Sequence, residues 1–298
     1  MKHRSLLSIV LVVVLFGAGC AGESKDDYAA KMAEQHAHDT TVATPITAEP
    51  TAAVDTSSIP YGTIDGQVVT GYMAAPANVD SARQVLGLEA GSALPGVIVI
   101  QEWWGLNDNI KAMARRLAGE GYRALAVDLY GGQVATQSEQ AQQLVQRALQ
   151  NQPALIENLR AAYRYLAEEQ NAPRVGVVGW CFGGAMSLQA ALALPKELDA
   201  TVIYYGRLVE DRAALTKLEM PILGFFGGQD DGIPLEQVRA FEQTLKDLGK
   251  EVEIHVYENA GHAFANPTGN NYDAGAAEDS WARTLAFFKE NLTGEVFM

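Results

Sequence analysis

Residues 175–184 read VGVVGWCFGG, and this stretch decides the fold that we expect. It predicts a short strand of β-branched residues, a turn that carries Cys181, and the start of a helix over 185–194. Gly179 and Gly183 flank the cysteine in a G-x-C-x-G pattern, which is the G-x-S-x-G nucleophile elbow with cysteine in place of serine. A side chain at either glycine would collide with the neighbouring strand or helix, and glycine avoids both collisions. We therefore predict that Cys181 is a nucleophile held on a sharp strand-to-helix turn.

Apolar, strand-like runs alternate with helical periodicity from Tyr61 onward. Residues 95–102, PGVIVIQE, form a continuous apolar run that is typical of a strand buried on both faces. The alternation predicts an α/β fold, in which a mostly parallel central sheet carries helices on both faces. No internal repeat or second linker interrupts the pattern, so we expect one domain over 61–298. The expected strands are 67–74, 97–101, 124–128, 174–178, 200–205, 221–227 and 252–257, and the expected helices are 107–120, 138–149, 153–169, 185–194, 235–248 and 272–291.

The N-terminal residues are typical of an export signal. A basic start (KHR, 2–4) precedes an apolar stretch over 6–16 that is too short for a comfortable membrane span, and a GAGC motif then ends at Cys20. This resembles a bacterial lipoprotein signal, in which the cysteine is lipidated, although Gly17 stands where a leucine is usual. We expect a signal peptide over 1–20 and a protein anchored by lipid in the bacterial cell envelope. The alternatives are a periplasmic or secreted protein with an ordinary signal, and an uncleaved cytoplasmic protein.

Residues 21–60 are rich in Ala, Thr, Asp, Glu, Ser and Pro and contain few large apolar side chains. Such a segment buries too little surface to offset the entropy of ordering, so we expect a flexible tether. His36 and His38 lie inside it. They allow two interpretations, a metal-binding pair and a solvated segment of low complexity, and we prefer the second.

The net charge argues against two kinds of partner, and the cysteine content favours a reactive thiol. The net charge of −14 argues against nucleic acid as a partner and against a polybasic membrane contact. Cys20 and Cys181 are the two cysteines of the chain, so a lipidated Cys20 would leave Cys181 as the one thiol of the mature domain. An exported protein with one such cysteine forms no internal disulfide, which is expected if that thiol is reactive.

A nucleophilic thiol needs a base and a group that orients the base. In hydrolases with this elbow, an acid and then a histidine follow the nucleophile, each on a loop after a later strand. Asp230 follows the strand 221–227, and His262 follows the strand 252–257. We predict that His262 takes the Cys181 proton and that Asp230 orients the imidazole. The alternatives are Asp231 as the acid, an Asx-turn role for Asp230, and a structural role for His262.

A fourth element follows the strand 97–101. Glu102 ends this strand and is followed by two tryptophans, which favours a role in the site. The simpler alternative is a solvated loop carboxylate. In this fold the loop supplies a second donor to the oxyanion hole, beside the backbone N–H that follows the nucleophile. The backbone N–H groups of Phe182 and Trp103 are therefore the candidate donors. A carboxylate near the thiol would hold its proton, or repel the thiolate until substrate arrives.

Together these motifs resemble the dienelactone hydrolase (carboxymethylenebutenolidase) family. The resemblance covers residues 61–292 and implies an α/β-hydrolase fold with no metal and no cofactor. It implies that Cys181 is the nucleophile and His262 its base. It further implies that Asp230 orients His262 and that Glu102 contacts the thiol. The motifs that carry it are QEWWGLN at 101–107, DLY at 128–130, GWCFGG at 179–184, GQD at 228–230 and AGHAF at 260–264.

Two departures from the family pattern concern the substrate. In the muconate-lactone enzymes of the family, arginines bind the substrate carboxylate, and one of them follows the catalytic histidine. Asn266 stands at that position here, and Ala263 replaces a serine. The second arginine is expected after the DLY motif, where residues 131–146 contain none before Arg147. A neutral amide cannot replace a bidentate guanidinium, so we do not expect dienelactone itself as the substrate.

We therefore expect a cysteine hydrolase of small-molecule esters or lactones that forms a thiol-ester acyl-enzyme. We expect no nucleic-acid partner, membrane contact only through the N-terminal lipid, and a monomer. A non-catalytic exported binding protein on the same fold is the alternative from another class. A thioesterase or a small-peptide hydrolase stays open among enzymes, because the same triad serves any acyl transfer.

Overall fold

The structure is a computed structural model that describes residues 30, 33, 36 and 49–294. The expected signal peptide over 1–20, its lipidation candidate Cys20, and His38 lie outside the described residues. Most of the expected tether over 21–60 lies outside them as well.

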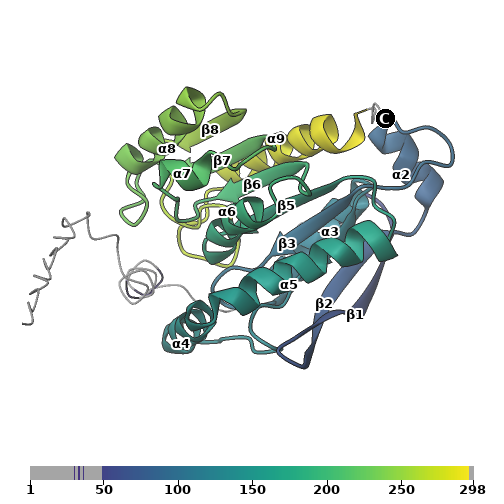
Figure 1. The fold of residues 1–298 in the computed structure, drawn as a ribbon, viewed down its shortest axis with the longest axis horizontal. Coiled ribbons are helices and arrows are strands. Elements are labelled where there is room, and N and C mark those ends of the chain that lie inside the picture. The colour runs from purple at the N-terminus through teal and green to yellow at the C-terminus, as the bar shows by residue number, and fades with distance from the viewer. Residues whose placement is uncertain (1–29, 31–32, 34–35, 37–48, 295–298) are drawn as a thin grey trace, which may run out of the picture.

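One mixed sheet forms the centre of the described chain, and its eight strands run in the order β1-β2-β4-β3-β5-β6-β7-β8 (Figure 1). β2 pairs antiparallel with both of its neighbours, β1 and β4. Every other neighbouring pair is parallel. This arrangement confirms the predicted α/β class with a mostly parallel sheet. The strands are β1 (Val54–Ile64), β2 (Gln67–Pro76), β3 (Gly96–Ile100), β4 (Arg123–Ala126), β5 (Val175–Trp180), β6 (Ala200–Tyr204), β7 (Ile222–Gly227) and β8 (Val252–Tyr257).

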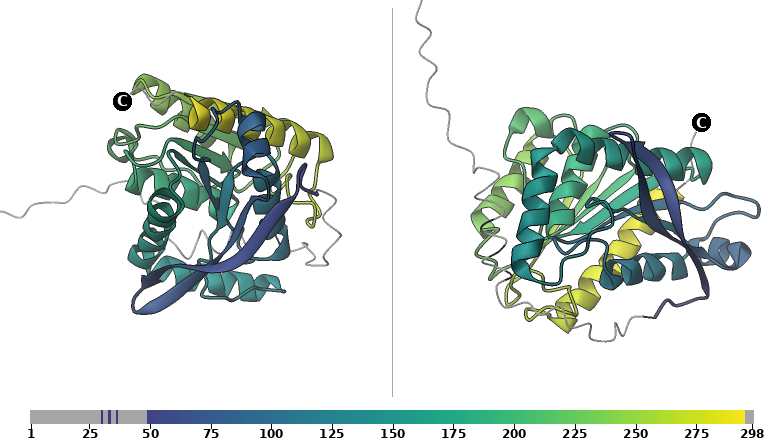
Figure 2. Two further views of the ribbon diagram at one scale, coloured as in Figure 1. Left: turned by 90° about the vertical axis from the view of Figure 1, so that its right-hand side faces the viewer. Right: turned by 90° about the horizontal axis from the view of Figure 1, so that it is seen from below.

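Helices cover both faces of the sheet, with α5 and α6 on one face and α3 and α9 on the other (Figure 2). The central strands β3, β5, β6 and β7 are buried along their whole length, as expected for parallel strands between two helical layers. The described helices are α2 (Val79–Leu86), α3 (Asp108–Gly119), α4 (Ser138–Gln150), α5 (Gln152–Arg164), which continues as one π-helical turn over Tyr165–Glu169, α6 (Phe182–Ala193), α7 (Arg212–Leu215), α8 (Leu235–Asp247) and α9 (Ala274–Thr293).

The first strand is the main difference from the expected layout. β1 begins at Val54, before the domain start that we expect at Tyr61, and it pairs with β2 along its length. Most of its first half is exposed and polar, so it lacks the alternation that marks a strand in sequence. Its register shifts between Pro60 and Gly62, where a proline is tolerated in an edge strand. α2 and α7 are further short elements that the periodicity does not predict.

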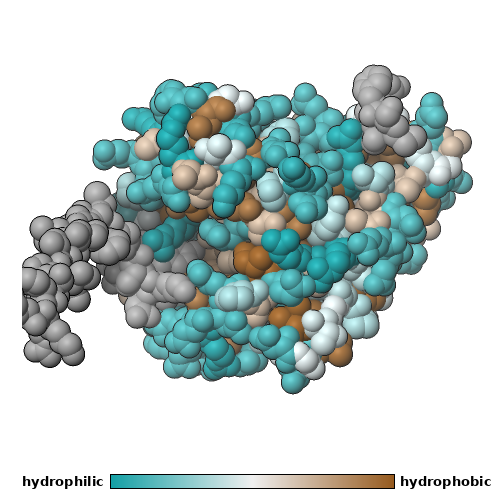
Figure 3. Space-filling view, in the orientation of Figure 1, coloured by the Kyte–Doolittle hydropathy of each residue, from teal (hydrophilic) through white to brown (hydrophobic). Residues whose placement is uncertain are grey.

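Hydrophilic side chains dominate the face in Figure 3, and hydrophobic ones show in small separate areas between them. Among the described residues, no helix combines the length and the apolar character needed to cross a membrane.

Candidate active site

The predicted elbow is present where β5 passes into α6. Cys181 joins the two elements with φ 56° and ψ −116°, a backbone conformation that costs a non-glycine residue about 1–3 kcal/mol. Its N–H donates a 3.0 Å hydrogen bond to the carbonyl of Tyr204 on the neighbouring strand β6. Such a strained residue persists only where its surroundings hold it, and the glycines on either side allow that close packing.

Gly179 and Gly183 are required by contact with backbone. A Cβ atom at Gly179 would overlap the carbonyl group of Gly183. A Cβ atom at Gly183 would lie 2.5 Å from the carbonyl oxygens of both Ile100 and Gln101, at the end of β3. Backbone atoms cannot move aside as side chains do, so the G-x-C-x-G spacing follows from the packing of β3, β5 and α6.

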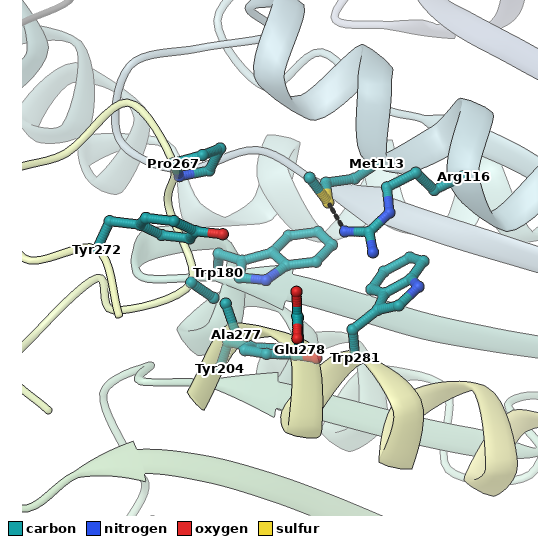
Figure 4. A pocket seen from close by; sticks show the side chains of 10 residues that line it. Met113, Arg116, Trp180, Tyr204, Pro267, Tyr272, Ala277, Glu278 and Trp281 are labelled. Carbon is teal, nitrogen blue, oxygen red and sulfur yellow. Dashed lines mark hydrogen bonds between the residues drawn. The ribbon is translucent and has the colours of Figure 1, made fainter. Parts of the chain in front are cut away.

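The last residues of β5 and β6 line a cavity apart from the elbow. Trp180 and Tyr204 line a cavity of about 180 Å³ between α3 and α9, where the guanidinium of Arg116 lies 4.1 Å from the ring centre of Trp281 (Figure 4). Cys181, one residue further along the chain, does not line this cavity and lies near His262 instead. The cavity in Figure 4 is therefore separate from the candidate nucleophile.

Asp230 and His262 meet at the carboxyl end of the sheet. Asp230 lies on the loop after β7 and His262 on the loop after β8, and Nδ1 of the imidazole is 2.7 Å from Oδ2 of the carboxylate. The second oxygen, Oδ1, accepts hydrogen bonds from the backbone N–H groups of Gly232 and Ile233 at 2.9 and 3.1 Å. Both side chains are buried, whereas Asp231 is exposed.

The environment of Asp230 favours the carboxylate. Burial by itself raises the pKa of Asp230, but the charge and hydrogen bond of His262, together with two backbone N–H groups, lower it below its ordinary value. Because Asp230 occupies Nδ1, the other ring nitrogen of His262 is left for chemistry. That atom, Nε2, is buried and has no hydrogen-bond partner among the described residues.

His36 is the unexpected member of the site. The sequence places it in a solvated tether, but the structure buries it to 1% exposure against Cys181, with Nε2 of the imidazole 3.3 Å from Sγ. Its ring stacks on Trp103 at 4.5 Å between centroids and meets the ring of His262 edge-on at 5.1 Å. The interpretation of His36 as a solvated residue is therefore wrong. No local pattern reveals the burial, because the contact spans 145 residues of the chain.

Three ligand-type atoms converge as a result. Sγ of Cys181 and one ring nitrogen each of His36 and His262 all lie within 4.8 Å of one another. The expected proximity of Cys181 and His262 is thus present, with a second imidazole beside the same sulfur.

Glu102, two residues after the end of β3, is buried at 1% exposure, so the alternative of a solvated loop carboxylate is wrong. Nδ2 of Asn266 donates a 2.7 Å hydrogen bond to its Oε2. The amide oxygen of Asn266 in turn accepts from the backbone N–H and hydroxyl of Thr268, at 2.9 and 2.7 Å, which fixes the direction of the amide. The residue that replaces an expected arginine therefore orients the buried carboxylate.

The two candidate oxyanion donors lie on neighbouring loops. β3 and β5 pair in parallel, with Ile100 opposite Gly179, so the segments that follow them lie side by side. Phe182 opens α6 and Trp103 follows Glu102, and both side chains are fully buried. This arrangement places both backbone segments at the same edge of the sheet as Cys181.

Tyr205 is a site residue that the sequence motifs do not identify. It follows β6 with φ 36°, is fully buried, and packs its ring edge-on against His262 at 5.2 Å between centroids. Burial, and then the negative charge of Glu102, raise the pKa of Tyr205 well above its ordinary value. The phenol therefore stays neutral and acts as a wall for the imidazole.

Comparisons with known proteins agree with the architecture and the site motifs. Residues 83–292 match the sequence profile of the Dienelactone hydrolase family. A carboxymethylenebutenolidase homologue from Methylorubrum extorquens is 32% identical over 266 residues, which cover 83% of this chain and 86% of that protein. A homologue from Escherichia coli K12 is 33% identical over 255 residues, which cover 80% of this chain and 93% of that protein.

Solved structures show the same fold. A dienelactone hydrolase homologue from Klebsiella pneumoniae superimposes with a TM-score of 0.68 at 29% identity, covering 79% of this chain and 98% of that one. A dienelactone hydrolase-like promiscuous phosphotriesterase from metagenomic libraries gives a TM-score of 0.69 at 25% identity and covers 82% and 100% of the two chains. These neighbours confirm the expected α/β-hydrolase architecture.

The elbow packing predicts that Gly179→Ala destabilises the fold. The added methyl group overlaps backbone, so we expect the free energy of unfolding to fall by about 3 kcal/mol in urea denaturation followed by circular dichroism. Gly275→Ala is the matched control, because its Cβ would meet only Asp273 Oδ1 at 3.5 Å within α9. We expect that control to be unchanged or slightly more stable. Equal stability of the two variants would contradict the packing argument.

The contact between Asn266 and Glu102 predicts a cost for Asn266→Asp. This near-isosteric change removes the donor and sets a second carboxylate against the buried one, so we expect a loss of about 2 kcal/mol in the free energy of unfolding at neutral pH. Asn259→Asp, at an exposed position, serves as the control and should change stability by less than about 0.5 kcal/mol. A stable Asn266→Asp variant would show that the amide does not hold Glu102.

Proposed function

Because the chain belongs to the dienelactone hydrolase family, we propose that it hydrolyses small ester or lactone bonds with Cys181 as the nucleophile. One observation carries this proposal. The imidazole of His262, held by Asp230 at 2.7 Å, reaches to within 4.8 Å of the sulfur on the strained elbow. This arrangement supports the proposal, because acyl transfer requires a nucleophile near a base that an acid orients.

In the proposed reaction, Nε2 of His262 takes the proton of the Cys181 thiol while sulfur attacks the substrate carbonyl carbon. The carbonyl electrons move onto oxygen, and the backbone N–H groups of Phe182 and Trp103 stabilise that oxyanion. The intermediate then expels the alcohol oxygen, which receives the proton from His262 and leaves a thiol ester on Cys181. Water, deprotonated by His262, attacks this thiol ester and releases the carboxylic acid and the free thiol.

Two features of the site support the nucleophile. Cys181 precedes the first residue of α6, where the positive end of the helix dipole favours a thiolate. Asp230 holds one tautomer of His262 and stabilises the imidazolium that forms during attack. We propose that Glu102, held by Asn266, opposes a permanent thiolate by its negative charge, so that the sulfur is activated only when substrate is bound.

We propose that the acyl group of a neutral substrate enters the cleft that Phe182 borders, although Cys181 itself does not line this cleft. This cleft of about 420 Å³ borders Phe182, next to the nucleophile, and apolar side chains such as Leu155 and Met186 line it. Arg207 in this cleft is accompanied by Glu210 and Asp211, so the cleft does not present a net positive charge to a carboxylate. With Asn266 in place of an arginine, this lining suits a neutral acyl group better than a dienelactone carboxylate.

His36 restricts access to the sulfur. Its Nε2 lies 3.3 Å from Sγ, so a substrate carbonyl that approaches Cys181 must displace the imidazole or pass beside it. In the proposed reaction, the substrate therefore either displaces His36 or reaches the sulfur from beside its ring.

The N-terminal sequence supports a location for this activity. The basic start, the short apolar stretch and Cys20 lead us to propose export and lipid anchoring in the bacterial envelope. An anchored hydrolase would act on esters or lactones that reach the envelope.

The proposed nucleophile predicts that Cys181→Ala lowers the hydrolysis of a small activated ester by at least about 10⁴-fold. The thiol supplies the attacking atom, and alanine cannot replace it. The measurement is the initial rate with a p-nitrophenyl acyl ester, and circular dichroism checks that the fold is kept. Undiminished turnover by the folded variant would refute the proposal.

The proposed acid predicts a sharp difference between two adjacent residues. Asp230→Asn leaves His262 without its carboxylate and favours the wrong tautomer, so we expect kcat to fall by about 10³- to 10⁴-fold. Asp231→Asn is the matched control, and because Asp231 is exposed we expect its kcat to equal that of the native chain. The reverse order of effects would assign the acid to Asp231.

A further inference from the structure

We propose that His36, Cys181 and His262 form a binding site for Zn²⁺. The hydrolase mechanism uses Cys181 and His262 but gives His36 no role, although its imidazole is buried against the sulfur. A metal site explains why two imidazoles and one thiol converge at one point. It goes beyond the proposed hydrolysis, because metal binding requires no acyl chemistry.

The donor set suits zinc. One cysteine sulfur and two imidazole nitrogens are the donors that Zn²⁺ binds most often, whereas Mg²⁺ and Ca²⁺ prefer oxygen. Three protein ligands leave a fourth position of the tetrahedron for water. The thiol binds as a thiolate, so its proton passes to solvent when the metal enters.

The spacing of the ligand atoms fits a single ion. Typical zinc–sulfur and zinc–nitrogen bonds place a sulfur and a nitrogen on the same tetrahedral ion about 3.5 Å apart. Nε2 of His36 and Sγ of Cys181 are 3.3 Å apart, and all three ligand atoms lie within 4.8 Å of one another. A small movement of side chains is enough to complete the coordination.

The groups behind the ligands orient them as zinc sites require. Asp230 accepts from Nδ1 of His262, so the imidazole directs Nε2 at the metal, which is the carboxylate–histidine–zinc arrangement. The buried Nε2 has no hydrogen-bond partner among the residues that the structure describes. His36 is held by stacking on Trp103 and by a 3.3 Å hydrogen bond from the hydroxyl of Ser138 to its backbone carbonyl.

The charge of the ion is balanced within the site. A Zn²⁺ ion bound to one thiolate carries a net positive charge, and such a charge is costly to bury without compensation. Asp230 and Glu102 are both buried at this edge of the sheet and provide it. The same two carboxylates that support the hydrolase chemistry therefore favour a bound cation.

Metal binding and hydrolysis exclude each other at this site. Zinc takes the sulfur that attacks the substrate and the Nε2 atom that accepts the proton. This consequence rests on the proposed function, whereas the binding site itself does not. We therefore expect Zn²⁺ to inhibit the hydrolase by occupying its nucleophile and base.

Cobalt(II) tests the site without reference to activity, because it replaces zinc and absorbs light. The full chain, freed of metal by chelation, is titrated with Co²⁺. We expect one equivalent to give tetrahedral d–d bands and a thiolate-to-cobalt charge-transfer band, and Zn²⁺ to abolish both. The charge-transfer band should be absent in Cys181→Ser. A titration without these bands, or a band that persists in Cys181→Ser, would overturn the proposal.

The His36→Gln variant tests whether Co²⁺ binds at this site or elsewhere on the protein. Loss of an outer-sphere partner typically weakens metal binding by 10- to 100-fold, so loss of the ligand itself should weaken Co²⁺ binding by at least about 100-fold. His255→Gln, which changes a histidine within β8, is the matched control and should keep the native affinity. Equal affinity of His36→Gln and His255→Gln would overturn the proposal.

The ester assay then distinguishes the two proposals. If the metal-free chain hydrolyses ester but binds no cobalt, the metal site fails and the hydrolase stands. If cobalt binds as expected but the metal-free chain hydrolyses no ester, the proposed function fails and the metal site stands.

Discussion

The strained backbone of Cys181 is the constraint on which the rest of the structure depends. Its positive φ persists because β5 and α6 are pressed together at Gly179 and Gly183, where backbone atoms occupy the space of a side chain. The same contact brings the elbow against the end of β3, from which Glu102 and Trp103 follow. One close approach of backbone thus sets the position of the sulfur, the start of the helix that favours its thiolate, and the loop that carries the buried carboxylate.

Parallel strand order brings the remaining groups to this point. β7 and β8 end at the same edge of the sheet as β5, so Asp230 and His262 meet although 32 residues separate them. The sulfur then lies among groups with opposing effects. In the proposed mechanism, His262 and the helix dipole favour a thiolate, whereas Glu102 opposes one. The second imidazole, from His36, fits neither role in hydrolysis and makes the same site suitable for a metal ion.

Local patterns in the sequence predict most of this fold and part of the site. The buried runs of β3, β5 and β7 and the helical spacing of α3 and α8 are local signals, and the loops that carry Asp230 and His262 follow from strand order. β1 is not predicted, because its first half is exposed and lacks the alternation of apolar and polar residues that marks a strand. The contacts of His36 with Cys181 and of Asn266 with Glu102 span 145 and 164 residues, so they depend on the assembled fold and leave no local trace.

The central claim is that Cys181 carries the acyl group during turnover. The most direct test is to quench the metal-free protein in acid during the hydrolysis of a slowly deacylated activated ester, and to map the adduct by mass spectrometry. The account predicts one acyl group, on the peptide that contains Cys181, bound as a thiol ester that hydroxylamine removes. An acyl group on another residue, or turnover of that ester with no covalent adduct at any time, would contradict it.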